Sequence, residues 1–173
     1  MTDDPSSVET WKAHTSTFDR VQAIALTVNQ PRPASYIASE AHVAENTART
    51  QLERLADLNV LLKYDVDGTT RYAPDPLHTR MQAIRELLNE HDYDELIELK
   101  TGLQEQIDTW QNKYEVDSPD ELYACVVETD RAEATSNIAK TVSDWKHVLY
   151  RLSIVEETIK NYRTYSRDEI ESA

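Results

Sequence analysis

Apolar residues recur at helical spacing three times in the first third of the chain, which predicts three short helices. The first helix follows Ser16, a favourable N-cap, and ends near Asn29. The second helix is expected over Ala34–Ala41 and the third over Ala44–Leu58. Their inward-facing positions are Phe18, Val21, Ala25 and Val28, then Ile37, Ala38 and Ala41, and finally Ala48, Leu52 and Leu55. Together the stripes predict a small three-helix core.

The pattern changes to β-prone residues after the third helix. Val60–Asp65 and Thr69–Ala73 are short runs rich in β-branched and aromatic residues, and Val66, Asp67 and Gly68 join them. Asp-Gly between two such runs is a strong hairpin signal, because tight hairpin turns need residues that tolerate positive φ. The helices and this hairpin predict a helix-turn-helix followed by a two-stranded wing.

The rest of the chain is predicted to be helical. Asp75-Pro76 and Asp92 are favourable helix starts, and Ser118 precedes a shorter helix from Pro119 to about Thr129. The apolar stripes of the other helices are Leu77, Met81, Ile84 and Leu88; Leu96, Leu99, Leu103, Ile107, Trp110 and Tyr114; and, in the last and longest helix, Ile138, Val142, Trp145, Leu149, Leu152, Val155, Ile159 and Tyr162. The last two stripes resemble coiled-coil seams.

These two long seams need partners. They can pair with each other as an antiparallel hairpin within one chain, or with the seams of a second copy. We favour pairing with a second copy, because two-fold dimers are the commonest oligomers and the two recognition helices of a dimer contact two half-sites on DNA. The predicted dimer contacts are Trp145, Leu149, Leu152 and Ile159.

The fold class that follows is mainly α with a small β-wing, in three regions. Residues 1–16 form a polar lead-in in which Val8 and Trp11 predict one helical turn packed on the body. Residues 17–75 form the winged helix-turn-helix, and residues 76–173 form a helical, coiled-coil-like dimerisation region.

Charge opposes a nucleic-acid partner at first sight. The chain has 32 acidic and 18 basic residues and a net charge of −14, whereas nucleic-acid binders usually carry a basic surface. The acid is unevenly distributed: residues 17–75 contain six Arg or Lys against eight Asp or Glu, and residues 76–173 contain 11 against 21. Abundant acid with few lysines and one Phe is typical of salt-accumulating microbes, in which screening shortens electrostatic repulsion.

The third predicted helix presents polar side chains opposite its apolar stripe, as a recognition helix does in the major groove. Asn46 suits adenine and Arg49 suits guanine, because each matches the donors and acceptors of that base edge. Lys63 and Arg71 lie on the hairpin, within reach of flanking phosphates. The predicted DNA-binding residues are Asn46, Thr47, Arg49, Thr50, Arg54, Lys63, Arg71 and Arg32. Double-stranded DNA is therefore the predicted partner, besides a second copy of the chain.

Eight short motifs resemble a family of haloarchaeal winged-helix proteins described as transcriptional regulators akin to the ArsR or MarR groups. The motifs are Phe18-Asp-Arg-Val, Ile37-Ala38, Asn46-Thr-Ala-Arg49, Leu52-Glu-Arg-Leu55, Arg71-Tyr72, Pro74-Asp-Pro76, Ser118-Pro-Asp-Glu-Leu122 and Asp144-Trp145. The resemblance covers nearly the whole chain and implies DNA binding and regulation. One departure is His42, which stands in the helix-helix turn where glycine is frequent. An ArsR-like thiolate metal sensor needs a cysteine pair, and the chain has only Cys125.

Other classes of function find little support in the sequence. The five histidines lack paired metal-ligand spacing, and no phosphate loop or nucleophile motif is present, so we expect no enzyme, no metal and no cofactor. Cys125 lies in an apolar run and is expected to be buried. No apolar stretch reaches the roughly 20 residues of a membrane span, and the N-terminus resembles no signal peptide. We therefore expect a cytoplasmic protein.

Two alternatives stay open at the level of sequence. A winged helix can serve as a protein–protein interaction module that never contacts DNA, since a fold does not fix a function. Glu45 and Glu53 share the outer face of the third helix and are expected to be solvated or to pair within the helix. Aromatic residues of the C-terminal helices form either plain core or the lining of an effector pocket. These residues are Trp110, Tyr114, Trp145 and Tyr162.

Overall fold

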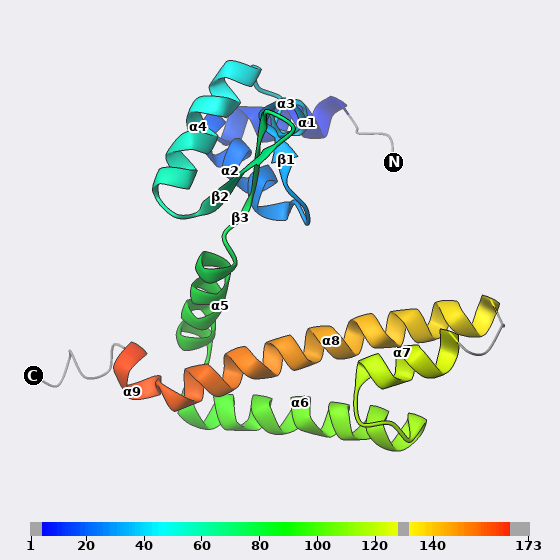
Figure 1. Cartoon of the computed structure of the whole chain (residues 1–173). Coiled ribbons are helices and arrows are strands. Elements are labelled where there is room, and N and C mark those ends of the chain that lie inside the picture. Colours follow the sequence, from blue (N-terminus) through cyan, green and yellow to red (C-terminus); the bar gives the residue numbers. More distant parts are fainter. Residues whose placement is uncertain (1–4, 128–131, 167–173) are drawn as a thin grey trace, which may run out of the picture. The chain divides into compact units, whose positions relative to one another are not determined.

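The computed structural model describes residues 5–127 and 132–166 and is mainly helical, with a small antiparallel sheet (Figure 1). The chain divides into two compact units, Met1–Met81 and Gln82–Ala173. The division falls inside helix α5 (Pro76–Glu90), whose first residue coincides with the predicted start of the helical region. We describe the two units separately.

Four helices of the first unit precede α5 in the part of the chain that the structure describes. They are α1 (Pro5–His14), α2 (Thr17–Thr27), α3 (Ala34–Glu40) and α4 (Glu45–Asp57). Helix α2 begins where Ser16 predicts it, because the Ser16 hydroxyl accepts a hydrogen bond from the Asp19 backbone N–H and the Asp19 carboxylate accepts one from the Ser16 N–H. The three helices predicted in this region are confirmed, each one or two residues shorter at its ends.

The sheet of the first unit has three strands, one more than predicted. They are β1 (Arg32–Pro33), β2 (Leu61–Val66) and β3 (Thr69–Pro74), in the order β1-β3-β2. No strand was predicted between the first two helices, but Arg32 pairs with Tyr72 of β3. A residue before proline favours extended backbone, and the missing N–H of proline is tolerated at a sheet edge.

The predicted hairpin is confirmed, with a tighter turn than expected. Val66 pairs with Thr69, so the loop contains only Asp67 and Gly68. Both have positive φ, 54° and 74°, as a two-residue hairpin turn requires. The Asp65 carboxylate accepts a hydrogen bond from the Gly68 N–H at 3.0 Å and holds the turn closed.

Small and branched apolar side chains form the core of the first unit. The buried members are Val21, Ala25, Ala34, Ile37, Ala38, Ala41, Ala48, Leu52, Leu55, Val60, Leu61 and Tyr72. They come from α2, α3, α4 and the sheet, and nearly every inward position predicted for the three helices is among them. Burial of these stripes fixes which face of α4 turns outward.

An arginine ties the helices of this unit together from inside. Arg20 is 9% exposed, and its guanidinium donates hydrogen bonds to the backbone carbonyls of Ala41 at 3.1 Å and Thr15 at 2.8 Å, with a longer bond to Lys12. The Trp11 ring lies 5.9 Å from the guanidinium carbon. Helix α1, which the lead-in predicted as a packed turn, is thereby linked to α2 and to the end of α3.

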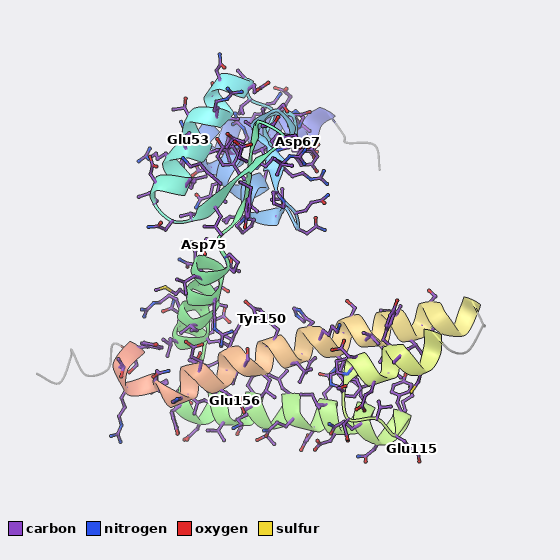
Figure 2. The ribbon with its side chains drawn as sticks, in the orientation of Figure 1. Glu53, Asp67, Asp75, Glu115, Tyr150 and Glu156 are labelled. Atoms are coloured by element: carbon purple, nitrogen blue, oxygen red, sulfur yellow. The ribbon has the colours of Figure 1, made fainter. Side chains whose placement is uncertain are left out.

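The second unit is helical throughout the residues that the structure describes. After α5 come α6 (Tyr93–Tyr114), α7 (Pro119–Val127), α8 (Ala132–Lys160) and the short α9 (Tyr162–Tyr165). Asp92 caps α6 as predicted, and the Asp75 carboxylate accepts from the Leu77 N–H at the start of α5 (Figure 2). The predicted end of the Pro119 helix, Glu128 and Thr129, lies outside the described residues.

Helix α8 packs along both α6 and α7, so the two long seams meet within one chain (Figure 1). The buried core members are Leu103, Ile107, Leu122, Val142, Trp145, Val148 and Val155. Trp145 has no exposed surface, and its ring centroid lies 5.7 Å from that of Trp110. The intramolecular alternative for the seams is therefore the one that the chain adopts.

Two other predictions for the helical region were wrong. Leu77 and Met81 belong to the predicted apolar stripe of α5 but are 67% and 63% exposed, and Ile84 is the buried residue of that helix. Cys125 is exposed rather than buried. Helical spacing gives the side of a helix on which a residue lies, and whether another element covers that side depends on distant parts of the chain.

Candidate nucleic-acid interface

Helix α4 carries five of the eight predicted DNA-binding residues and turns four of them toward solvent. Thr47 is half-buried, and the other four predicted contacts on this helix are exposed: Asn46, Arg49, Thr50 and Arg54. The helix keeps this orientation because Ala48, Leu52 and Leu55 are buried on its opposite side. The outer face of α4 is thus a continuous polar surface with two arginines.

The turn that leads into α4 contains His42 at the position where helix-turn-helix proteins frequently have glycine. His42 adopts a φ of 51°, in the left-handed region where glycine is favoured. Backbone hydrogen bonds from the N–H groups of His42 to Ser39 and of Val43 to Ala38 close the turn. The His42 ring also meets the Trp11 ring edge-on, with centroids 6.3 Å apart. Packing against α1 therefore supports a conformation that histidine rarely adopts.

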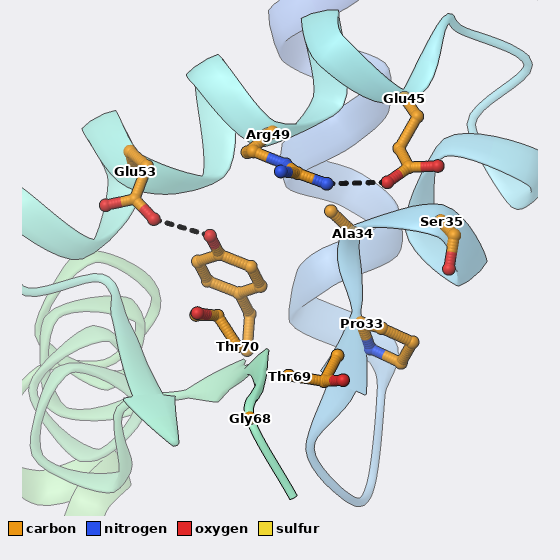
Figure 3. Close-up of a pocket in the computed structure, with 10 residues that line it drawn as sticks. Pro33, Ala34, Ser35, Glu45, Arg49, Glu53, Gly68, Thr69 and Thr70 are labelled. Atoms are coloured by element: carbon orange, nitrogen blue, oxygen red, sulfur yellow. Dashed lines mark hydrogen bonds and ion pairs between the residues drawn. The ribbon is translucent and has the colours of Figure 1, made fainter. Parts of the chain in front are cut away.

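Arg49 is the central cation of the α4 face, and it is already paired. Its guanidinium lies 2.7 Å from the Glu45 carboxylate one turn earlier, and the side chains are 60% and 49% exposed (Figure 3). Such exposed pairs contribute typically below about 1 kcal/mol. The pairing within the helix that was one expectation for Glu45 is confirmed, and it is weak enough for a phosphate or base to replace it.

A second carboxylate on α4 binds the hairpin. Glu53 accepts a hydrogen bond from the Tyr72 hydroxyl at 2.5 Å and lies 2.8 Å from the Lys63 ammonium. The Lys63 and Tyr72 hydrogen bonds hold the pKa of Glu53 below its ordinary value. The same contact raises the pKa of Lys63, while burial, and then Glu53, raises the pKa of Tyr72. The network fixes β2 and β3 against the middle of α4.

Between these two carboxylates lies a hollow of about 350 Å³ (Figure 3). Helix α4 forms one side, the beginning of α3 a second, and the end of the hairpin a third. The lining residues are Pro33, Ala34, Ser35, Glu45, Arg49, Glu53, Gly68, Thr69, Thr70 and Tyr72. Arg49 lies between Glu45 and Glu53 along this wall, so the hollow carries both signs of charge.

Two of the three remaining predicted cations on the first unit lie over aromatic rings. The Arg54 guanidinium lies 5.2 Å from the centroid of the Phe18 ring, and that of Arg32 lies 4.6 Å from the Tyr36 ring. Arg71 is half-buried, and its Nε has no hydrogen-bond partner among the described residues. The structure therefore brings Arg49 and Lys63 to one face beside the hairpin, and does not bring Arg54, Arg32 and Arg71 into that cluster.

Three features of the first unit were not predicted from the sequence. Tyr72 was expected only as a strand residue, yet its hydroxyl anchors Glu53. Arg20 was given no role from the sequence, yet it is buried. Tyr36 supports Arg32. Each contact joins residues distant in sequence or on different elements. Only the hairpin carried a signal, because Lys63 of β2 and Tyr72 of β3 are cross-strand partners and therefore share a face.

The predicted dimer contacts differ in how far they are available. Trp145 has no exposed surface, and Leu152 and Ile159 pack against the core of the helical unit. Leu149 alone among the four is exposed, at 39%. As long as the helical core stays closed, Trp145 therefore has no surface to offer to a second copy.

Within the described ranges, no group of three or more His, Cys, Asp or Glu side chains is arranged to hold a metal ion. Across the same ranges, the helices are too short or too polar to cross a membrane. Three of the four aromatic side chains considered as a pocket lining belong to the core: Trp145 is buried, and Trp110 and Tyr114 pack against the same cluster. The fourth, Tyr162, lies against Tyr93, with ring centroids 5.4 Å apart.

A family model described as a family of unknown function (DUF7342) matches residues 15–164, and the chain belongs to that family. No curated protein matches the chain. The matched residues begin just before α2 and extend into α9, so they include the α4 face and the helical unit.

Proposed function

We propose that this member of a family of unknown function is a sequence-specific DNA-binding regulator whose first unit is a winged helix-turn-helix. The observation that supports this proposal most is the exposed face of α4, where Asn46 and Arg49 lie beside a hairpin that presents Lys63. The order of elements and the strand order β1-β3-β2 support a winged helix, in which the second helix of the pair enters the major groove.

The proposed roles follow from side-chain chemistry. Asn46 and Arg49 contact base edges, since a planar amide and a guanidinium each make two hydrogen bonds to a purine. Thr47 and Thr50 lie beside them, and the Thr50 hydroxyl is held by the Asn46 carbonyl at 3.0 Å. Lys63 contacts the phosphate backbone. Arg32, Arg54 and Arg71 lie further from this cluster and are proposed as peripheral phosphate contacts.

The ion pairs on the α4 face give binding an unusual dependence on salt. Arg49 and Lys63 must exchange Glu45 and Glu53 for DNA, and both carboxylates repel phosphates. Salt weakens these competing pairs and the repulsion from the acidic chain, as well as the attraction to DNA. We therefore propose that affinity passes through a maximum as salt increases, instead of falling from dilute buffer upward.

The test is fluorescence anisotropy with the DNA upstream of the protein's own gene and a scrambled duplex, from dilute to molar KCl. Saturable, sequence-preferring binding that Arg49→Ala weakens about tenfold or more supports the regulator, because one bidentate base contact contributes about 1–3 kcal/mol. Lys140→Ala is the matched control, since Lys140 is an exposed cation of α8. Equal binding to both duplexes, or an unchanged Arg49→Ala variant, would contradict the proposal.

A protein–protein interaction module is the second candidate. It is favoured by the acidic residues that accompany both cations on the α4 face, and by the net negative charge of residues 76–173. Absence of binding to either duplex at every salt concentration would select this candidate over the regulator.

We also propose that the protein acts as a homodimer in which the helical unit is a main contact. Leu149 and Tyr150, 39% and 47% exposed on α8, are the apolar residues that support this contact best. Cytoplasmic localisation is part of the same proposal, since a regulator meets DNA there.

A further inference from the structure

Strand β2 is the longer of the two edge strands of the sheet, since the described strands have the order β1-β3-β2 and β1 has only two residues. Its second to sixth residues, 62–66, are all exposed. An edge strand offers unpaired backbone N–H and C=O groups to any other strand, and proteins usually protect such edges. A strand that pairs with β2 has to match the side chains on both of its faces.

The two faces of β2 differ in chemistry. Leu62, Tyr64 and Val66 share the face opposite α4 and are 37%, 38% and 37% exposed. Lys63 and Asp65 lie on the other face, where Lys63 reaches Glu53 of α4. The strand therefore carries an exposed apolar row on one side and a pair of opposite charges on the other.

This arrangement is symmetric about Tyr64. In an antiparallel pair of two β2 strands with the two-fold axis at Tyr64, Lys63 lies opposite Asp65 of the second copy, and Leu62 lies opposite Val66 of the second copy. Opposite charges and apolar pairs that face each other across strands are stabilising. A two-fold axis at Lys63 would instead place the two copies of Lys63 opposite each other, and an axis at Asp65 would do the same for the two copies of Asp65. Both registers place like charges opposite each other.

We infer that β2 pairs with β2 of a second copy in this Tyr64-centred register. The two three-stranded sheets then join into one sheet, and the two-fold axis closes the assembly so that no further copy is added at this edge. Lys63 lies between Glu53 of its own chain and Asp65 of the second copy. The pairing involves the first unit and does not require that the protein binds DNA.

Disulfide trapping tests this register directly in the full chain. Cys125→Ser removes the native thiol, and single cysteines are then introduced at position 64 or 66. Residues opposite each other in an antiparallel pair have Cα atoms about 4.5–5.5 Å apart, which a disulfide can span, whereas two copies of residue 66 are separated by about 13 Å along the strands. Tyr64→Cys is expected to form the disulfide dimer at least about tenfold faster than Val66→Cys.

Mixing two variants adds a test that keeps Tyr64 intact. Leu62→Cys protein mixed with Val66→Cys protein is expected to form the mixed disulfide, since these positions face each other in the proposed register. Either variant alone is expected to remain mostly reduced. Equal rates for Tyr64→Cys and Val66→Cys, or a mixed disulfide no faster than the self-disulfides, would overturn the inference.

The charges supply an independent check in the Tyr64→Cys background. Lys63→Asp places two acidic residues opposite each other and is expected to slow trapping about tenfold, and adding Asp65→Lys is expected to restore the rate, because the pairs become attractive again. Failure of the second change to restore trapping in a protein with an unchanged circular dichroism spectrum would overturn the register. Because DNA plays no part in trapping, these outcomes are separate from those of the anisotropy test.

Discussion

Two ion pairs of the first unit lie on the outer face of α4, whereas two ion pairs of the second unit join one helix to another. Arg49 and Lys63 pair with carboxylates of α4 and remain about half exposed. In the helical unit, Lys100 of α6 lies 3.1 Å from Glu156 of α8, which is labelled in Figure 2. Lys146 of α8 lies 2.7 Å from Asp120 of α7.

The cores of the two units also differ, in the size of the side chains that fill them. Five alanines are buried in the first, which lets the short helices approach closely, while the second is filled by a tryptophan and long aliphatic side chains. The helical unit uses its seams on itself. The first unit combines a compact core with a polar, hollowed face and an open strand edge, the two surfaces for which DNA and a second β2 strand are proposed as partners.

The largest effect is expected where the helical core is densest. Trp145→Ala should lower the free energy of unfolding by about 3–5 kcal/mol, because it leaves a cavity between α6 and α8. Urea denaturation followed by circular dichroism measures the change. Tyr123→Ala is the matched control, since Tyr123 is 52% exposed on α7 and its removal should change stability little. A small effect of Trp145→Ala would mean that the seam is not closed within one chain.

Arg20→Ala tests the first unit in the same way. The guanidinium satisfies the carbonyls of Ala41 and Thr15, and its loss should cost about 2 kcal/mol of stability, since buried acceptors lose a charged donor. Arg163→Ala, at an exposed arginine of α9, is the control. Equal denaturation midpoints for the two variants would show that the contacts of Arg20 do not stabilise the unit.

Several local features of the fold could be predicted from the sequence. The start of α2 at Ser16, the start of α6 at Asp92 and the turn at Asp67-Gly68 were predicted correctly, because each depends on residues within a few positions. The inward stripes of the first three helices followed from periodicity alone. Local chemistry was sufficient for these features.

Features that depend on distant contacts were not predicted. Strand β1 exists because β3 lies beside it, and Arg20 is buried because α1 and the end of α3 cover it. The seam of Trp145 carried no information on whether its partner was its own chain or another. On the α4 face the exposed cations were identified, but the attachment of Glu53 to Tyr72 was not.

Association through the helical unit is tested by Leu149→Glu. Leu149 is 39% exposed, so the change should weaken the proposed dimer while the fold persists. Sedimentation velocity should show a shift toward monomer, with Ser143→Glu, an exposed position of the same helix, as the control. Changing Leu152 as well would confuse the result, because Leu152 packs in the core. Unchanged dimers would exclude this part of α8 from the interface.

The smallest effect is expected at Glu53, where the face of the first unit meets its sheet. The pKa of Glu53 is below its ordinary value of 4.5 in the folded chain, because it accepts hydrogen bonds from Lys63 and then Tyr72. A depressed carboxyl pKa contributes stability that is present above the unfolded value and is lost as pH falls through the folded value. The side chain is 43% exposed, so solvent screening keeps this contribution below about 1 kcal/mol.

Glu53→Gln should therefore lower stability slightly at pH 7 and flatten its decline below pH 4.5. Denaturation midpoints at several pH values measure both effects. Glu98→Gln is the control, since Glu98 is an exposed carboxylate of α6. A decline below pH 4.5 as steep as in the parent protein would show that Glu53 does not fasten the hairpin to α4. Asn46 and Arg49 would then have to be placed beside Lys63 by packing alone.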